Sequence, residues 1–236
     1  MYTIKDFLNT KSAGGPSFSA SGDMLAYISN LTGTFQAFCK PTKGGDATQL
    51  TDFEDSLRFA VFSPTDDDLL IFGRDEGGNE KTQFYLLQLS TKQITSLTNL
   101  PDVIHHWGGW SRDGKYIDFT STERNGTDFD VYTLNLETME KTCVLAQGGW
   151  HGSLGFSPEG TMLVVSRAES NVNHDLFLID LSNPKDCQHL TPHQGHATYG
   201  AVRWLPDESG FYLISNQDTD LEEVRFYDIK QRSFRP

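Results

Sequence analysis

The apolar positions of this chain recur in a fixed arrangement: an aromatic residue, a short polar turn, and then a run of β-branched, aromatic and other apolar residues. The clearest copy runs from Trp110 to Ser121, with Ser111-Arg112-Asp113-Gly114 as the turn and Tyr116 at the start of the apolar run. In such turns proline presets φ and glycine accepts a positive φ, so the chain can reverse between two extended segments. The arrangement therefore predicts a β-hairpin.

Five copies of this hairpin pattern follow one another. Their leading aromatic residues are Phe18, Phe62, Trp110, Phe156 and Trp204, spaced 44 to 48 residues apart. A second aromatic landmark follows each hairpin and predicts a third strand, at Phe38, Tyr85, Tyr132, Phe177 and Tyr227. A third landmark keeps the same period and predicts a fourth strand, at Leu50-Thr51, Leu97-Thr98, Leu145 and Leu190-Thr191.

A four-stranded antiparallel sheet cannot bury both of its faces alone, so each unit must stack on a neighbour. Radial stacking of such sheets, at a period of about 40–50 residues, is typical of a β-propeller. We expect an all-β fold, a β-propeller of four-stranded antiparallel blades, with five repeats present in a single propeller domain or fragment. The repeats occupy residues 16–52, 53–100, 101–147, 148–192 and 193–236.

The two ends of the sequence bear on whether the ring is closed. Little sequence follows the third strand of the fifth repeat, and a propeller is stable when its last blade closes on its first. We therefore expect an incomplete ring from a longer propeller protein, whose open blade edges pair with another copy. The alternative is a closed five-bladed ring in which residues 1–9 supply a strand. Tyr2 to Asn9 predict a short amphipathic helix or a strand, and Lys11 to Gly15 a polar lead-in.

Composition narrows the choice of partners and compartment. The 236 residues carry a formal net charge of −13 and a pI near 4.8, which argues against nucleic acid or an anionic membrane as a partner. No basic and apolar leader opens the sequence and no apolar run is long enough to span a bilayer, so a cytoplasmic location is expected. Cys39, Cys143 and Cys187 form an odd set without close spacing, as expected for reduced thiols.

Several segments are more specific than the blade pattern requires. They are Ser29-Asn30-Leu31-Thr32-Gly33-Thr34-Phe35-Gln36, Phe72-Gly73-Arg74-Asp75-Glu76-Gly77-Gly78-Asn79-Glu80, Gln83-Phe84-Tyr85-Leu86-Leu87, His106-Trp107-Gly108-Gly109-Trp110-Ser111, Asp128-Phe129-Asp130-Val131-Tyr132 and Leu190-Thr191-Pro192-His193. Together they resemble the N-terminal β-propeller of serine peptidases of the prolyl oligopeptidase family, in particular the bacterial acylaminoacyl-peptidase branch. The resemblance covers Pro16 to Phe234.

The resemblance implies a propeller that sits over a C-terminal α/β-hydrolase domain with a Ser-Asp-His triad and limits entry to short peptides. We therefore expect the substrate-gating portion of a serine peptidase that hydrolyses short peptides or acyl-peptides, with the hydrolase domain outside this chain. The nearest match to a nucleophile elbow, Gly152-Ser153-Leu154-Gly155, has His151 where the G-x-S-x-G motif needs its first glycine. The chain is expected to lack peptidase activity of its own, and its expected partners are the hydrolase domain and a short peptide.

Candidate site residues lie in the loops between second and third strands, where polar side chains gather. Because strands alternate in direction, these loops share one rim. The rim candidates are Arg74, Asp75, Glu80, Arg124 and Arg167. They are either ordinary solvated charges or groups that pair with the hydrolase domain or with a peptide terminus. Glu80 is the residue to test first, although pairing with Arg74 inside the blade would give it a structural role.

No metal or cofactor is expected. Adjacent His105 and His106 point to opposite faces of a strand, and His189, His193 and His196 lack a cysteine or carboxylate at finger-like spacing. Two other functions stay open. One is a non-enzymatic scaffold, similar to the periplasmic Tol-system propeller, that binds a protein partner. The other is a sugar-processing enzyme of the oligogalacturonate-lyase type, which would use a histidine-rich metal site in its central channel.

Overall fold

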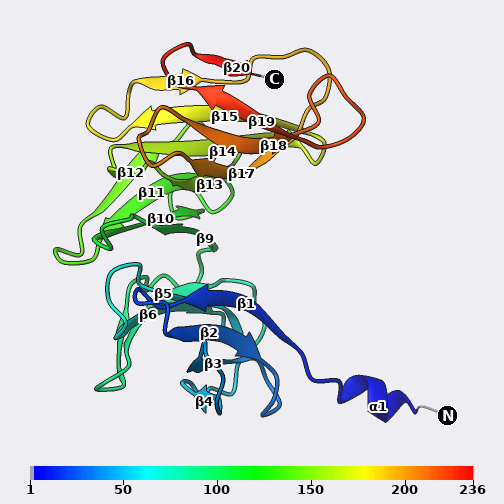
Figure 1. The fold of residues 1–236 in the computed structure, drawn as a ribbon, viewed down its shortest axis with the longest axis vertical. Helices are drawn as coiled ribbons and strands as arrows, with labels where there is room; N and C mark the ends of the chain where they lie inside the picture. Colours follow the sequence, from blue (N-terminus) through cyan, green and yellow to red (C-terminus); the bar gives the residue numbers. More distant parts are fainter. Residues whose placement is uncertain (1–2, 236) are drawn as a thin grey trace. The chain divides into compact units, whose positions relative to one another are not determined.

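Five separate four-stranded sheets make up the chain in the computed structural model, which describes residues 3–235 (Figure 1). Every sheet is antiparallel, and its strands lie in sequence order, so each strand pairs with the next one along the chain. The predicted all-β fold of four-stranded antiparallel blades is thereby confirmed. No helix among residues 3–235 is long and apolar enough to cross a membrane.

The first sheet begins at Ala13, three residues before the predicted start of the first repeat, and each sheet is built from four consecutive strands. The first sheet holds β1 (Ala13–Phe18), β2 (Met24–Ser29), β3 (Gln36–Pro41) and β4 (Thr48–Gln49), and the second holds β5 (Leu57–Phe62), β6 (Leu69–Arg74), β7 (Gln83–Gln88) and β8 (Gln93–Ser96). The third holds β9 (His105–Trp110), β10 (Tyr116–Ser121), β11 (Asp130–Asn135) and β12 (Lys141–Leu145). The fourth holds β13 (Trp150–Phe156), β14 (Met162–Ser170), β15 (Asn173–Asp180) and β16 (Cys187–His189), and the fifth holds β17 (Tyr199–Trp204), β18 (Gly210–Ser215), β19 (Glu223–Asp228) and β20 (Ser233–Arg235).

The N-terminal segment forms a helix rather than a strand. α1 spans Ile4–Leu8 and begins at a capping box, in which the Thr3 N–H donates to Asp6 Oδ2 at 2.7 Å and the Asp6 N–H donates to Thr3 Oγ1. Tyr2 lies outside the described residues. The polar lead-in that we predicted up to Gly15 is too long, because β1 already begins at Ala13.

Each predicted hairpin forms where the leading aromatic residue ends the first strand of a sheet. In the first four hairpins a buried serine follows the aromatic, whereas Leu205 stands there in the fifth. Ser111 Oγ accepts from the Tyr116 N–H at 2.9 Å, and Ser157 Oγ accepts from the Met162 N–H at 3.1 Å. Gly114 has a φ of 71°, which a residue with a side chain would adopt only with strain. The buried serine and the turn glycine thus stabilise the reversal of the chain between the two strands.

The threonine of each leucine-threonine pair also acts within its own sheet. Thr51, Thr98 and Thr191 are buried, and each hydroxyl accepts a hydrogen bond from a backbone N–H of the third strand of its own sheet, at 2.7 to 2.9 Å. The threonine thus pairs a strand N–H beyond the end of the short fourth strand, as buried backbone groups require. Where the fourth strand is only two or three residues long, as in β4 and β16, this bond extends the pairing.

The first strand of every sheet carries an irregularity in its pairing with the second strand. The register shifts between Gly14 and Ser17, Leu57 and Phe59, Asp118 and Phe119, Ser153 and Gly155, and Gly200 and Arg203. Such bulges increase the local twist and re-aim individual side chains. The hydrophobic period of two predicts none of them, because it assumes a regular strand.

The chain divides into two compact units, Met1–Asp102 with the first two sheets and Val103–Pro236 with the other three. In the first unit, one cluster joins both sheets, with Leu70 and Phe72 completely buried against Ala26 and Ala37. In the second unit, Leu163 and Val165 pack on Val131, and Val164 and Leu176 pack on Phe211 and Leu213. Each sheet therefore buries a face on its neighbour within its unit, as stacked blades must.

Candidate functional site

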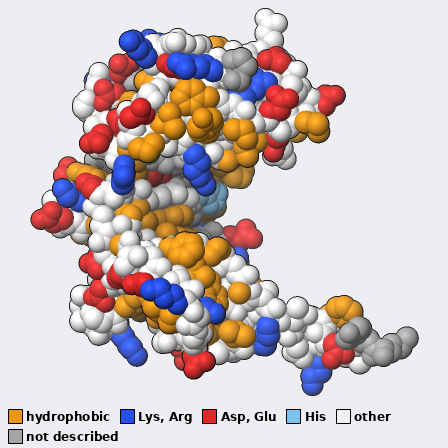
Figure 2. All heavy atoms as spheres, in the orientation of Figure 1, with side chains coloured by type: hydrophobic (Ala, Val, Ile, Leu, Met, Phe, Trp, Pro, Cys, Tyr) orange, Lys and Arg blue, Asp and Glu red, His pale blue; other side chains and the backbone are white. Residues whose placement is uncertain are grey.

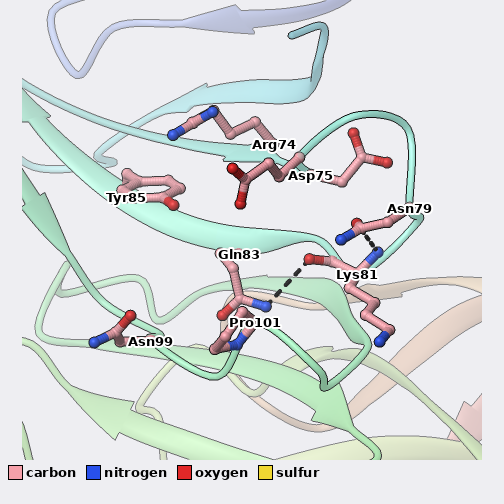
Figure 3. A pocket seen from close by; sticks show the side chains of 9 residues that line it. Arg74, Asp75, Asn79, Lys81, Gln83, Tyr85, Asn99 and Pro101 are labelled. Carbon is pink, nitrogen blue, oxygen red and sulfur yellow. Dashed lines mark hydrogen bonds between the residues drawn. The ribbon is translucent and has the colours of Figure 1, made fainter.

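A small pocket lies at the rim of the second sheet, beside the loop between β6 and β7 (Figure 3). It has a volume of about 120 Å³. Its walls are made of Arg74, Asp75, Glu76, Asn79, Lys81, Gln83, Tyr85, Asn99 and Pro101. Two of the predicted rim residues, Arg74 and Asp75, thus line one pocket, whereas Glu80 does not.

Arg74 is held in place by aromatic rings. Its guanidinium carbon lies 4.7 Å from the ring centre of Phe53 and 5.4 Å from that of Tyr85, and its Nη1 lies 3.5 Å from Asp55 Oδ2. Contact between a guanidinium and an aromatic face is favourable and restricts the side chain. Its Nε is buried and has no acceptor among residues 3–235. The predicted internal pairing of Arg74 with Glu80 is therefore wrong, because Asp55 is the acid within reach.

Asp75 organises the loop rather than facing solvent. It is 3% exposed and accepts hydrogen bonds from Arg58 Nη2 at 2.5 Å and from the Glu80 N–H at 2.9 Å. Burial acts to raise the pKa of Asp75, but the hydrogen bonds from Arg58 and Glu80 outweigh it, so the pKa is lowered. Arg58 is the extra residue of the β5 bulge, and the bulge lets its side chain reach this carboxylate.

Glu80 occupies an unusual backbone position on this loop. Its φ is 63°, its backbone N–H is bound to Asp75, and its side chain is exposed. The Glu80 carboxylate makes no hydrogen bond or ion pair within the described part of the chain, whereas the neighbouring Lys81 Nζ lies 2.9 Å from Asp102 Oδ1. Glu80 thus presents an uncommitted negative charge on the rim, at a fixed point of the loop.

Gln83 is a residue of the pocket whose role the sequence analysis missed. Its Nε2 donates to the carbonyls of Lys81 at 3.1 Å and Leu100 at 3.0 Å, and its Oε1 accepts from the Leu100 N–H at 3.0 Å (Figure 3). Gln36 makes the same bonds to Phe53, at 2.9 and 3.0 Å. Both glutamines begin the third strand of their sheets, 47 residues apart. This repetition is the feature of the sequence that could have indicated their role. Each ties its strand to the connection to the next repeat.

The other two rim candidates are bound to acids of their own sheets. Arg124 donates from Nε to Asp130 at 2.5 Å and from Nη2 to Asp128 at 3.0 Å, and these hydrogen bonds raise the pKa of Arg124. Asp130 is completely buried. Arg167 pairs with Glu169 and lies 5.6 Å from the ring centre of Phe177. Neither guanidinium is a free cation on the surface.

His189 and His193, two of the histidines considered as metal ligands, are held by partners in their own sheet. His189 Nε2 is 2.7 Å from Asp175 Oδ1, and His193 is bonded to Thr191 and Asn173 at 2.8 Å each. No group of three His, Cys, Asp or Glu in the range 3–235 is placed to hold a metal ion. Ser153 lies inside β13 and not at a strand-to-helix turn, so it has none of the geometry of a nucleophile elbow.

The chain shares its fold with several proteins of known structure. An oligogalacturonate lyase in complex with manganese matches with a TM-score of 0.77 and 16% identity, over 95% of this chain and 66% of the lyase. A prolyl endopeptidase matches with a TM-score of 0.75 and 16% identity, over 97% of this chain and 36% of that protein. A putative TolB from Agrobacterium tumefaciens matches with a TM-score of 0.70 and 17% identity, over 95% of this chain and 80% of TolB.

These three identities are too low to show more than a common fold, and the chain spans about a third of the endopeptidase. No curated protein sequence matches it. The family comparison is more specific. Residues 47–234 match the model of the prolyl oligopeptidase N-terminal β-propeller domain, which covers most of the sequence and four of the five sheets. The chain therefore belongs to the family of prolyl oligopeptidase N-terminal β-propeller domains.

Proposed function

We propose that this chain is the substrate-gating propeller of a serine peptidase that cleaves short peptides or acyl-peptides, and that it acts together with a C-terminal α/β-hydrolase domain. The family match over residues 47–234 is the observation that carries the proposal. The propeller supplies a rim that selects substrates, and the hydrolase domain supplies the triad. A cytoplasmic location and the acylaminoacyl-peptidase branch belong to the same proposal.

The rim of the second sheet is the part that we assign to recognition. Glu80 offers an uncommitted carboxylate next to a pocket whose Arg74 is fixed between two rings. The ammonium of a peptide amino terminus pairs with a carboxylate, and a peptide carbonyl or carboxylate pairs with a guanidinium. Arg124 and Arg167 also belong to the proposed rim, where their local acids hold them in position to meet the hydrolase domain.

Binding of tripeptides to the full protein tests the recognition step. A tri-alanine with a free amino terminus is expected to bind more tightly than its N-acetylated form, and Glu80→Gln is expected to remove that difference, a change of about tenfold. Glu54→Gln in the same unit is the matched control, since Glu54 is also an exposed acid and lies outside the pocket. Equal affinity of the two tripeptides for the unsubstituted protein would rule out Glu80 as the ammonium site.

Catalysis gives the second test of the proposal. Peptide p-nitroanilides are expected to yield no product with residues 1–236 alone and to be cleaved by a protein that joins them to a hydrolase domain with a G-x-S-x-G elbow. Cleavage should then slow as the peptide is lengthened, because a gate excludes long chains. A gene in which no such domain accompanies these residues would favour the TolB-like scaffold. Stoichiometric manganese in the purified protein would favour the lyase-like enzyme.

We also propose that the protein self-associates through its exposed blade surfaces. Tyr212 and Val224 lie on the fifth sheet with 47% and 71% of their surface exposed. Exposed apolar residues on a sheet favour contact with another sheet. Light scattering at increasing concentration is expected to show a rising mass, and Val224→Lys is expected to reduce it. A constant monomer mass at high concentration would refute this part.

A further inference from the structure

A second hollow lies in the unit Val103–Pro236. It is formed where the first strands of three sheets end, since β13 contacts both β9 and β17. Its volume is about 490 Å³, and its walls include Trp110, Arg112, Phe156, Arg203 and Trp204. No aspartate or glutamate of the described chain lines it, although the whole sequence has a net charge of −13. The hollow is therefore a basic and aromatic surface in an acidic protein.

The two arginines of this hollow lack acidic partners. Neither Arg112 nor Arg203 forms an ion pair among the described residues. Six other arginines do form one, namely Arg58, Arg74, Arg124, Arg167, Arg225 and Arg235.

The nearest acidic residues in the sequence accept hydrogen bonds within their own hairpin turns. Asp113 accepts from Ser111 Oγ at 2.7 Å and from the Lys115 N–H at 3.1 Å. Asp207 accepts from the Ser209 N–H and hydroxyl at 3.1 and 2.8 Å. These turn bonds hold both carboxylates near the hairpin backbone. Arg112 and Arg203 therefore keep their positive charges for another partner.

The two tryptophans of the hollow also lack hydrogen-bond partners. The indole Nε1 atoms of Trp110 and Trp204 are both buried, and neither has an acceptor within residues 3–235. An indole N–H can only donate, and a buried donor without an acceptor is destabilising. A ligand that brings acceptor oxygens would satisfy them.

The backbone of β17 is distorted next to one of these arginines. The register of β17 against β18 shifts between Gly200 and Arg203, and Ala201 within the shift has a φ of 52°. A left-handed conformation is unfavourable for an alanine. Arg203 follows directly, and its Nη1 donates to the Val202 carbonyl at 2.7 Å, which holds the side chain at the hollow. Strain of this kind is frequent where a side chain is positioned for binding.

We propose that this hollow binds a carboxylate attached to an apolar group. The guanidinium groups of Arg112 and Arg203 would hold the carboxylate, because arginine matches the two oxygens of a carboxylate with paired N–H donors. The indole N–H groups would complete its hydrogen bonds, and the faces of Phe156 and the tryptophans would contact the apolar group. The proposal does not depend on peptidase function, since it concerns binding by these residues alone.

Binding of N-acetyl-phenylalanine and of its neutral amide to the full protein tests the proposal directly. The acid is expected to bind at least about tenfold more tightly than the amide, because charge-assisted hydrogen bonds are lost with the amide. In the ¹H–¹⁵N spectrum, the acid should shift two indole resonances, which Trp110→Phe and Trp204→Phe assign. Equal affinity of acid and amide would overturn the proposal, and so would shifts confined to the indoles of Trp107 and Trp150.

Two variants and one control test the arginines. Arg112→Gln and Arg203→Gln should each weaken binding of the acid by about tenfold and leave binding of the amide unchanged. Arg232→Gln is the control, because Arg232 is an exposed arginine of the same unit outside the hollow. Loss of acid binding in all three would indicate general charge attraction and overturn the proposal. Inorganic phosphate that displaces the acid at equal concentration would overturn the assignment to carboxylates.

Discussion

Gly108 of β9 leaves room for the side chain of Asp118 on β10. A β-carbon added at Gly108 would lie 2.8 Å from the backbone oxygen of Asp118 and closer still to its carboxylate. Asp118 is completely buried, and the groups that lower the pKa of its carboxyl by hydrogen bonding are the Ser153 hydroxyl and the Gly109 N–H. Gly108 also falls within the bulge of its strand, so the bulge and the missing side chain together accommodate the acid. Packing against Asp118 thus explains the first glycine of the His-Trp-Gly-Gly-Trp segment.

Gly108→Ala is expected to destabilise the fold by about 1–3 kcal/mol, because the new methyl group overpacks a filled site. Urea denaturation measures the change. Gly109→Ala is the control, since a β-carbon there would lie 3.8 Å from Asp118 Oδ2, an ordinary contact distance. Equal effects of the two substitutions would contradict the packing explanation.

The stability of the protein should depend on the protonation of Asp118. Burial raises the pKa of Asp118 to about 7, although the Ser153 hydroxyl and the Gly109 N–H act in the opposite direction. An aspartate in the unfolded chain has a pKa of about 3.9, so the folded state binds the proton more tightly. The contribution of this group to stability is complete below about pH 4 and is lost as the pH rises through about 7.

Asp118→Asn removes this titration and keeps the shape. The free energy of unfolding of the unsubstituted protein is expected to lose on the order of 4 kcal/mol, relative to the variant, between pH 4 and pH 8. Denaturation at several pH values measures both profiles, and their difference isolates Asp118 from the other carboxylates. Parallel profiles would show that Asp118 does not titrate in this range.

Arg124 is expected to stabilise the third sheet through its bond to the buried Asp130. Arg124→Gln leaves that carboxylate without its guanidinium, so a loss of about 2–3 kcal/mol is expected in urea denaturation. Arg167→Gln is the comparison, because its partner Glu169 is 49% exposed and such pairs contribute about 0–1 kcal/mol. A larger loss for Arg167→Gln than for Arg124→Gln would contradict this assignment of roles.

Ala201→Gly is expected to stabilise the protein by about 0.5–1 kcal/mol. The substitution removes the free-energy cost of the left-handed conformation at a φ of 52°. That cost is larger than the entropic cost of introducing a glycine. Ala168→Gly in β14 is the control and should destabilise by a similar amount, because strand alanines are not strained. The melting temperatures of the two variants should therefore move in opposite directions from that of the unsubstituted protein.

The sequence predicted the order and type of the strands because each depends on residues close together in the chain. A leading aromatic residue such as Trp110, the serine after it and the turn glycine act within one hairpin. The aromatic residue recurs in all five hairpins, because each blade needs the same reversal between its first two strands. The period of 44 to 48 residues then indicated how many blades to expect. The resemblance to the peptidase propellers likewise rested on short sequence segments, such as those around Arg74 and Gln83.

The partners of the charged residues were decided only by the tertiary structure. Arg74 pairs with Asp55 and Asp75 pairs with Arg58, because a bulge in β5 and the strand register bring together residues that lie 17 to 19 positions apart. The hydrophobic pattern contains no information on bulges, so it could not show that Glu80 keeps a free carboxylate. The basic hollow likewise depends on three strand ends from different repeats, which only packing brings together.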